Sequence, residues 1–247
     1  MVTAAPQDQW RLLDVQAHDT RLAQIAHRLR TLPEHAEIDA LDVKLRAVTA
    51  DLVTARTVAG DVKRELNKAE ADVELVRRRA DRDRARLDSG QGTAKDLQAT
   101  QHELVSLTAR QSALEDVELE VMERLETAQG RVAAAEAEQA RLEAQIAEVA
   151  GRRDAAVATL EAEAAGERAE RENAVAGLPG DLVALYEKIR ASSDGLGAAR
   201  LRQRRCEGCR MELTPVDMGR IRAAAQEEVL RCEECRRILV RTADSGL

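Results

Sequence analysis

The stretch that decides the fold is Leu41–Leu87, LDVKLRAVTADLVTARTVAGDVKRELNKAEADVELVRRRADRDRARL. Its apolar residues recur in alternating steps of four and three over six heptads, which predicts a coiled-coil seam. The seam residues are Leu41, Leu45, Val48, Leu52, Ala55, Ala59, Val62, Leu66, Ala69, Val73, Val76 and Ala80, followed by an interruption at Asp83 and then Leu87. The many alanines favour close packing of two helices and leave little room for a ligand.

A turn follows this stretch at Asp88–Thr93, where two glycines stand among small polar residues. Thr93 is a candidate N-cap, with Asp96 three positions further on. A second series with helical spacing then begins. It consists of Leu97, Leu104, Leu107, Leu114, Val121, Leu125, Ala128, Val132, Ala135, Leu142, Ile146 and Val149. Because the turn is short, the two helices are predicted to form an antiparallel hairpin with its tip at about residues 88–94.

Upstream, Trp10–Leu32 also has an apolar stripe at helical spacing, and Pro33 interrupts or kinks it. Folding the chain about Gln91 puts Pro33 opposite approximately Val149, beside Gly151. We therefore expect a coiled-coil arm over residues 1–176 with kinks near residues 33 and 151. Residues 177–247 are expected to form a second domain, a short helix plus a zinc ribbon, whose last residues fray.

Composition supports long helices rather than a large globular core. The 247 residues include no Phe, one Trp and one Tyr, and 34% of them are charged. No apolar run approaches the roughly 18 residues that a membrane span needs, and the first residues do not resemble a signal peptide. The sequence therefore predicts a cytoplasmic protein without a membrane partner.

The four cysteines form two Cys-x-x-Cys pairs, Cys206–Cys209 and Cys232–Cys235, separated by 22 residues. Two such pairs in a chain expected to be cytoplasmic indicate a zinc site rather than disulfides. Four thiolates complete a closed tetrahedron, so the predicted cofactor is one structural Zn²⁺ bound by Cys206, Cys209, Cys232 and Cys235. Redox cycling of a Cys-x-x-Cys pair is the alternative, but it usually involves one pair at a helix start.

The flanks of both pairs fit a zinc ribbon. Ala199–Arg205 alternates like a strand that enters the first pair, and Ile238–Arg241 is predicted to leave the second. Between them, Thr214 is a candidate cap for a short helix that starts at Pro215. The overall fold class is therefore mainly α: a long antiparallel coiled-coil hairpin followed by a small C-terminal zinc ribbon.

Several segments together resemble the bacterial C4-type zinc-ribbon proteins with an N-terminal coiled-coil hairpin. They are Leu12–Gln16 with Asp19, Leu32–Glu34, Asp96–Leu104, Leu114–Asp116, Leu182–Arg190 and the two cysteine pairs with the Ile-Leu-Val-Arg that follows. The ending at Ile238–Thr242 looks actinobacterial. The resemblance implies a hairpin-plus-ribbon fold, bound zinc and a role in binding nucleic acid or protein partners, with no known reaction. One departure is Arg236, where Gly is expected for a left-handed backbone.

Charge is unevenly distributed along the chain. The net formal charge is −7, whereas residues 200–247 contain 11 Arg and 8 acidic residues. The candidate nucleic-acid-binding residues are Arg200, Arg202, Arg204, Arg205 and Arg210. The first three are expected on one strand face and the other two near the first cysteine pair, forming a patch that contacts phosphates. The alternative is a solvated edge that pairs with Glu207, Glu212 or acids of the arm. No Phe or Tyr stands among these arginines, so base stacking is not supported.

No catalytic motif is recognisable. The four histidines share no ligand spacing, and a coiled coil offers no cavity for a small-molecule substrate. The sequence therefore predicts a non-enzymatic adaptor whose ribbon binds RNA or DNA and whose arm binds a protein. A purely protein-binding chaperone or scaffold, and a catalytic zinc protein, are the alternatives.

Overall fold

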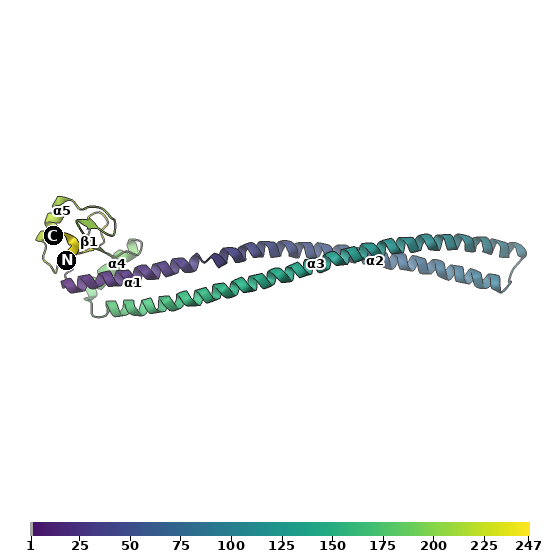
Figure 1. Cartoon of the computed structure of the whole chain (residues 1–247), viewed down its shortest axis with the longest axis horizontal. Coiled ribbons are helices and arrows are strands. Elements are labelled where there is room, and N and C mark those ends of the chain that lie inside the picture. Colours follow the sequence, from purple (N-terminus) through teal and green to yellow (C-terminus); the bar gives the residue numbers. More distant parts are fainter. Residues whose placement is uncertain (1) are drawn as a thin grey trace. The chain divides into compact units, whose positions relative to one another are not determined.

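The computed structural model describes residues 2–247, which divide into two compact units. Among the described residues, one unit joins residues 2–35 to residues 151–247, and the other is residues 36–150. Figure 1 shows the elements in chain order. They are α1 (Pro6–Arg30), α2 (Pro33–Asp88), α3 (Ala94–Val175), α4 (Gly180–Ser192), β1 (Ala198–Arg202), β2 (Arg205–Cys206), α5 (Pro215–Ala223), β3 (Ile238–Val240) and the 3₁₀ turn η1 (Ala243–Ser245).

The unit of residues 36–150 is an antiparallel hairpin of α2 and α3, as predicted. Its turn contains Gly90 and Gly92, both with positive φ (66° and 132°), a conformation that glycine adopts at little cost. The Thr93 hydroxyl accepts a hydrogen bond from the Asp96 backbone N–H, and the Asp96 carboxylate accepts one from the Thr93 N–H. This reciprocal capping box begins α3.

Every seam residue predicted on either helix of this hairpin is buried or half-buried. Val62 and Leu66 pack with Val121 and Leu125, and nearer the turn Leu107 packs with its own cluster on α2. The cross-helix ion pairs are Arg56–Glu136, Arg77–Glu115, Arg79–Glu103 and Arg124–Glu65. Exposed pairs of this kind contribute only about 0–1 kcal/mol each, so the apolar seam determines the register.

In the other unit, α1 lies antiparallel to the C-terminal part of α3. Ile25 packs between Leu160 and Ala164, so Pro33, eight residues on, faces approximately residue 154 rather than Val149. The helix is interrupted before Pro33, because α1 ends at Arg30 and α2 begins at Pro33. By contrast, α3 continues as a helix through Gly151, so the predicted kink there is no break in the helix.

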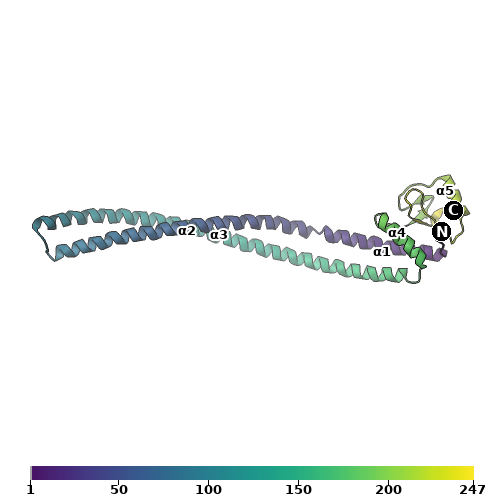
Figure 2. The same ribbon diagram turned by 180° about the vertical axis from the view of Figure 1, so that it is seen from behind.

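The start of α1 also packs against α4 and the small sheet. Leu12 and Val15 of α1 are completely buried together with Leu182 and Tyr186 of α4 and with the sheet residues Ala198, Ile238 and Val240. Figure 2 shows α4 alongside α1 on the side facing the viewer. Thus α1 supplies part of the core beneath the ribbon. The domain boundary predicted at residue 176 stays a prediction of the sequence.

The sheet places β1 in the centre, with β2 antiparallel on one side and β3 parallel on the other. β1 ends at Arg202, earlier than predicted, because Gln203 and Arg204 form a turn with positive φ values of 45° and 67°. The predicted helix cap is confirmed: the Thr214 hydroxyl accepts from the Asp217 N–H at the start of α5.

The sequence predicted that the last residues fray, but residues 243–245 form the 3₁₀ turn η1. Ser245 is fully buried, and its hydroxyl donates to the Leu201 carbonyl oxygen at 2.9 Å. Across residues 2–247, no helix has both the length and the apolar character that crossing a membrane requires.

Candidate metal centre and nucleic-acid interface

The four cysteine sulfurs converge on one point. All four Sγ atoms lie within 4.8 Å of one another, with Cys206–Cys235 at 3.8 Å and Cys209–Cys232 at 3.9 Å. A tetrahedron with Zn–S bonds near 2.3 Å requires sulfurs about 3.8 Å apart. The cluster therefore fits one structural zinc ion, and four thiolates leave no coordination position for a substrate.

The two cysteine pairs share one backbone design. The N–H of Arg210 donates to the Cys206 carbonyl at 2.7 Å, and the N–H of Arg236 donates to the Cys232 carbonyl at 2.8 Å. Both arginines are left-handed, with φ of 61° and 62°. The left-handed backbone expected at Arg236 is confirmed, whereas the matching one at Arg210 was not predicted. Glycine would adopt this backbone conformation without strain at position 210 or 236.

Packing around the first cysteine pair explains why residue 208 is a glycine. A Cβ on Gly208 would lie 2.9 Å from Cβ of Ala199 and 3.0 Å from Cδ of Arg237, which is too close for ordinary packing. Arg237 occupies this space because its guanidinium donates to the carbonyls of Leu196 and Ser193. The first cysteine pair is thereby packed against the loop that follows α4.

Burial changes the protonation of two of the four thiols. It raises the pKa of Cys206 and Cys232. For Cys235 burial acts in the same direction, but a hydrogen bond from the Arg237 N–H and bonds with neighbouring groups outweigh it and lower the pKa. Zinc coordinates thiolates, so metal binding displaces protons from this cluster and supplies a fixed crosslink where the apolar core is small.

The predicted arginine patch is only partly one surface. Arg200 and Arg202 are exposed on the same side of β1, whereas Arg204 lies in the turn and is not on the strand face as predicted. The three arginines have acidic neighbours. The pairs are Arg200–Asp244 at 3.9 Å, Arg202–Glu207 at 3.7 Å and Arg204–Glu212 at 4.0 Å. Two of these acids, Glu207 and Glu212, are those that the alternative interpretation named.

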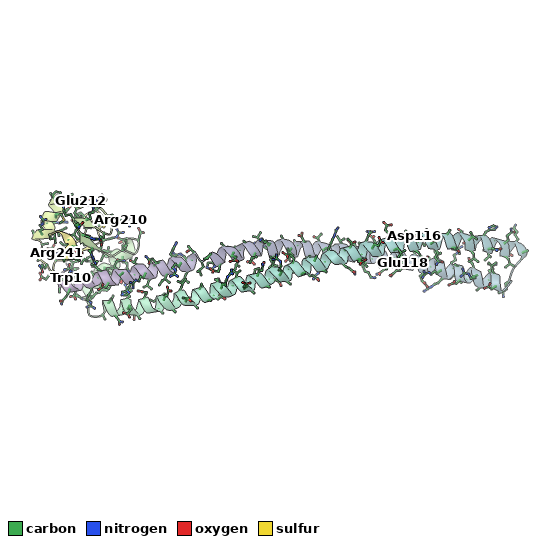
Figure 3. The ribbon with its side chains drawn as sticks, in the orientation of Figure 1. Trp10, Asp116, Glu118, Arg210, Glu212 and Arg241 are labelled. Carbon is green, nitrogen blue, oxygen red and sulfur yellow. The ribbon has the colours of Figure 1, made fainter. Side chains whose placement is uncertain are left out.

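Arg205 and Arg210 differ from the other three, because no ion pair to either is found within residues 2–247. Together with Arg202 they line a shallow depression of about 400 Å³ beside Cys206 and Glu207. Figure 3 labels Arg210 and Glu212 on this part of the ribbon. We call Arg202, Arg205 and Arg210 the arginine face.

Residues 15–194 match the family model described as the CT398-like coiled coil hairpin domain. The chain belongs to the CT398-like coiled-coil hairpin family. Residues 205–239 match a second model, the C4-type zinc ribbon domain, which agrees with the sulfur geometry.

Similar proteins agree with this membership. An uncharacterized protein of Mycobacterium tuberculosis is 37% identical over 94% of this chain and 95% of its own length. A solved structure from Mycobacterium smegmatis has 35% identity and a TM-score of 0.86, covering 97% of this chain and 100% of that one. CT398 from Chlamydia trachomatis shares the fold, with a TM-score of 0.66, 14% identity, and coverage of 96% and 98%.

In this member of the CT398-like family, a buried polar cluster that the sequence did not reveal joins α1, α3 and α4. The Asp19 carboxylate, 4% exposed, accepts from Arg171 Nε at 2.7 Å and lies 3.4 Å from Arg190. Gln16 Nε2 donates to the Gly195 carbonyl, and its Oε1 accepts from the Gly197 N–H. Burial, followed by the hydrogen bond to Asp19, raises the pKa of Tyr186. Gln16 and Asp19 belong to one of the segments that carry the family resemblance.

Proposed function

We propose that this zinc-binding protein is a non-enzymatic adaptor whose ribbon binds RNA or DNA and whose helical hairpin binds a protein partner. The observation that carries the nucleic-acid part is the arginine face. Two of its guanidinium groups, Arg205 and Arg210, have no acidic partner among the described residues and lie beside a zinc cluster that fixes their backbone. Groups of this kind bind phosphates as charge-assisted, often bidentate hydrogen-bond donors.

The weakness of the neighbouring ion pairs favours this function over the alternative, in which the arginines serve only to pair with nearby acids. The pairs of Arg200, Arg202 and Arg204 are 3.7–4.0 Å long and involve exposed side chains. Pairs with that exposure contribute about 0–1 kcal/mol, so a phosphate can replace the acid at little cost. Zinc with four thiolates carries about −2, which favours contact with the outer arginines and not with the cysteines.

The test is fluorescence anisotropy of the zinc-loaded full chain with labelled RNA, single-stranded DNA and duplex DNA at low and physiological salt. The variant is Arg205→Gln with Arg210→Gln. The matched control is Arg56→Gln with Arg124→Gln, which removes the same charge from the hairpin, where both side chains are exposed. Loss of two phosphate contacts should reduce the salt slope on a single strand by about 1.4.

Equal binding by the variant and the parent chain, with the same salt slope, would contradict the assignment of nucleic acid to the arginine face. The zinc content of each variant, measured by mass spectrometry under native conditions, confirms that the ribbon is intact. Binding that both double variants weaken equally would indicate a general effect of charge instead of a specific surface.

A second candidate, a chaperone or scaffold without nucleic-acid contact, is favoured by a separate observation on α3. Val117, Leu119 and Met122 are 48%, 58% and 47% exposed within six positions. Asp116 and Glu118, labelled in Figure 3, belong to the same segment, which is strongly acidic. Exposed apolar side chains rimmed by charge are typical of protein-binding surfaces.

This candidate is tested with the full chain carrying Leu119→Gln and Met122→Gln. The control is Val43→Gln with Val53→Gln, where the parent side chains are equally exposed on α2. A partner that survives nuclease treatment, binds the arginine-face variant normally and is lost only from the α3 variant would favour the scaffold over the nucleic-acid adaptor.

A further inference from the structure

A second depression, of about 370 Å³, lies on the ribbon unit away from the cysteines. It is enclosed by the start of α1, the end of α5 and the C-terminal residues. Its principal walls are Pro6, Trp10, Ile221, Arg222, Arg241 and Leu247. Figure 3 labels Trp10 and Arg241 in this region. None of the described residues that line it has an acidic side chain.

Trp10 is the only tryptophan of a chain that has no phenylalanine, yet its side chain is 52% exposed. Tryptophan side chains are on average highly buried in folded proteins. Its indole N–H donates to the Arg241 carbonyl oxygen at 2.7 Å. The ring is therefore fixed at one edge while half of its surface stays open to solvent.

Arg241 fixes the backbone around the Trp10 ring, and its own guanidinium is not available to a ligand. Its guanidinium donates to the carbonyl oxygens of Ile221 and Ala224 at the end of α5, and of Ala225, Gln226 and Glu228 in the loop that follows. These bonds satisfy the helix C-terminus, where carbonyls otherwise lack partners. Gln9, only 2% exposed, also donates to the Gln226 carbonyl, so α1 and this loop are tied together.

Of the two arginines among residues 2–247 that line the depression, Arg222 is the one whose side chain is open to solvent. Its side chain is exposed, and its one hydrogen bond, to the Gly246 carbonyl, is long at 3.4 Å. The C-terminal segment connects this arginine to the turn beside the arginine face, since the N–H groups of Gln203 and Arg204 donate to Asp244 and Ser245. The depression and the arginine face thus lie on one module, on either side of residues 244–246.

We propose that Trp10 and Arg222 bind one unpaired nucleotide of a single-stranded nucleic acid, with the base stacked on the indole and a phosphate on the guanidinium. This inference rests on the proposed function and specifies its substrate class as single-stranded. Base–aromatic stacking tolerates any base, because every base has a π face, and an arginine beside the ring adds attraction for the phosphate. The aromatic residue comes from the other end of the sequence, which is why none stands among the arginines.

Fluorescence of the single tryptophan reports on this site directly, because stacking of a base quenches an indole. The zinc-loaded full chain is titrated with oligothymidylate, with an abasic deoxyribose-phosphate oligomer of the same length, and with duplex DNA. We expect oligothymidylate to quench Trp10, the abasic oligomer to bind more weakly without quenching, and the duplex to leave the fluorescence unchanged.

Two substitutions at Trp10 separate stacking from structure. Trp10→Leu and Trp10→Phe both lose the hydrogen bond to Arg241, but only phenylalanine keeps an aromatic face. Trp10→Leu should weaken binding of oligothymidylate by about 5- to 100-fold, and Trp10→Phe should retain most of the affinity. Equal losses in both variants, with lowered thermal stability, would mean that Trp10 is structural and would overturn the proposal.

Arg222→Gln should reduce the salt slope by about 0.7, whereas Arg220→Gln, on the same helix but paired with Glu233, should not change it. Binding that depends on Arg205 and Arg210 but neither quenches Trp10 nor responds to Trp10→Leu overturns this inference and leaves the proposed function standing. If no oligomer binds even at low salt, both this inference and the proposed nucleic-acid function are contradicted.

Discussion

The hydroxyl of Tyr186 donates a 2.6 Å hydrogen bond to the Asp19 carboxylate, joining two residues 167 positions apart in the sequence. Arg171 of α3 binds the same carboxylate, so three helices meet at one buried charge. The helix at the start of the chain is therefore part of the unit that carries the zinc site.

Removing Asp19 should be severely destabilising. Asp19→Ala leaves Arg171 without its principal buried partner, and breaking a buried ion pair from one side costs about 3–5 kcal/mol. Denaturant unfolding of the zinc-loaded chain measures the loss of stability. Amide exchange in α4 shows whether the loss is located at this cluster. Asp14→Ala is the matched control, because Asp14 is an exposed acid on the same helix and should change stability by less than about 0.5 kcal/mol. Similar effects of the two changes would contradict the importance of the cluster.

Zinc removal should affect α1 as well as the ribbon. Chelation leaves four free thiols, two of them buried, in place of metal-bound thiolates and removes the crosslink between the two cysteine pairs. We expect amides of β1, β3 and the first half of α1 to lose protection against exchange, because Leu12 and Val15 share a core with Ile238 and Val240. The α2–α3 hairpin of residues 36–150 should keep its protection. Hydrogen exchange with mass spectrometry checks this, and an α1 that stays protected would contradict it.

Glycine at the two left-handed positions should stabilise the ribbon. Arg210 and Arg236 have φ near 60°, which costs a non-glycine residue roughly 1–2 kcal/mol. For Arg236→Gly part of the gain is offset, because the exposed ion pair with Glu233 is lost. Comparison with Arg236→Ala isolates the backbone, since alanine loses the same ion pair but keeps the strain. Thermal denaturation of zinc-loaded samples should rank Gly above Ala, and the reverse order would exclude strain at this position.

The hairpin turn should loosen in acid. The pKa of Asp96 is lowered, first by the hydrogen bond from the Thr93 hydroxyl and then by the Thr93 N–H. A carboxyl with a lowered folded-state pKa stabilises the fold above its unfolded pKa, and this stabilisation is lost as the pH falls through the folded-state value. Amide exchange at residues 93–97 should therefore accelerate at low pH relative to the mid-hairpin. Asp96→Asn should show faster exchange at neutral pH and a weaker pH response, while an unchanged response would exclude this cap.

Local patterns predicted the helices and the metal site well. The seam from Leu41 to Leu87 and the capping box at Thr93 depend on residues within one or two turns of each other, so periodicity reveals them. The spacing of the cysteines likewise predicts the sulfur cluster, because each pair is a local turn. These features need no knowledge of distant contacts.

Contacts between distant segments were not predictable in this way. Trp10 and Arg241 are 231 positions apart, and nothing near Trp10 indicates that it lies on the ribbon. Arg204 was assigned to a strand face because alternation of residue types does not reveal a turn of non-glycine residues. The position opposite Pro33 was also misplaced, because counting from the turn ignores where Ile25 packs against α3.

The shared core of α1 and β3 has a consequence for the order of folding. Val15 and Ile238 in this core are about 220 positions apart, and closing so long a loop from an unfolded chain is slow. The antiparallel helices between them form from local contacts near the turn and shorten the effective loop. We therefore expect helix formation to precede zinc uptake in refolding, with stopped-flow circular dichroism leading the signal of a zinc-sensitive dye. Simultaneous signals would contradict this order. In a chain released before β3 is synthesised, Leu12 and Val15 would lack the part of their core that Ile238 and Val240 supply.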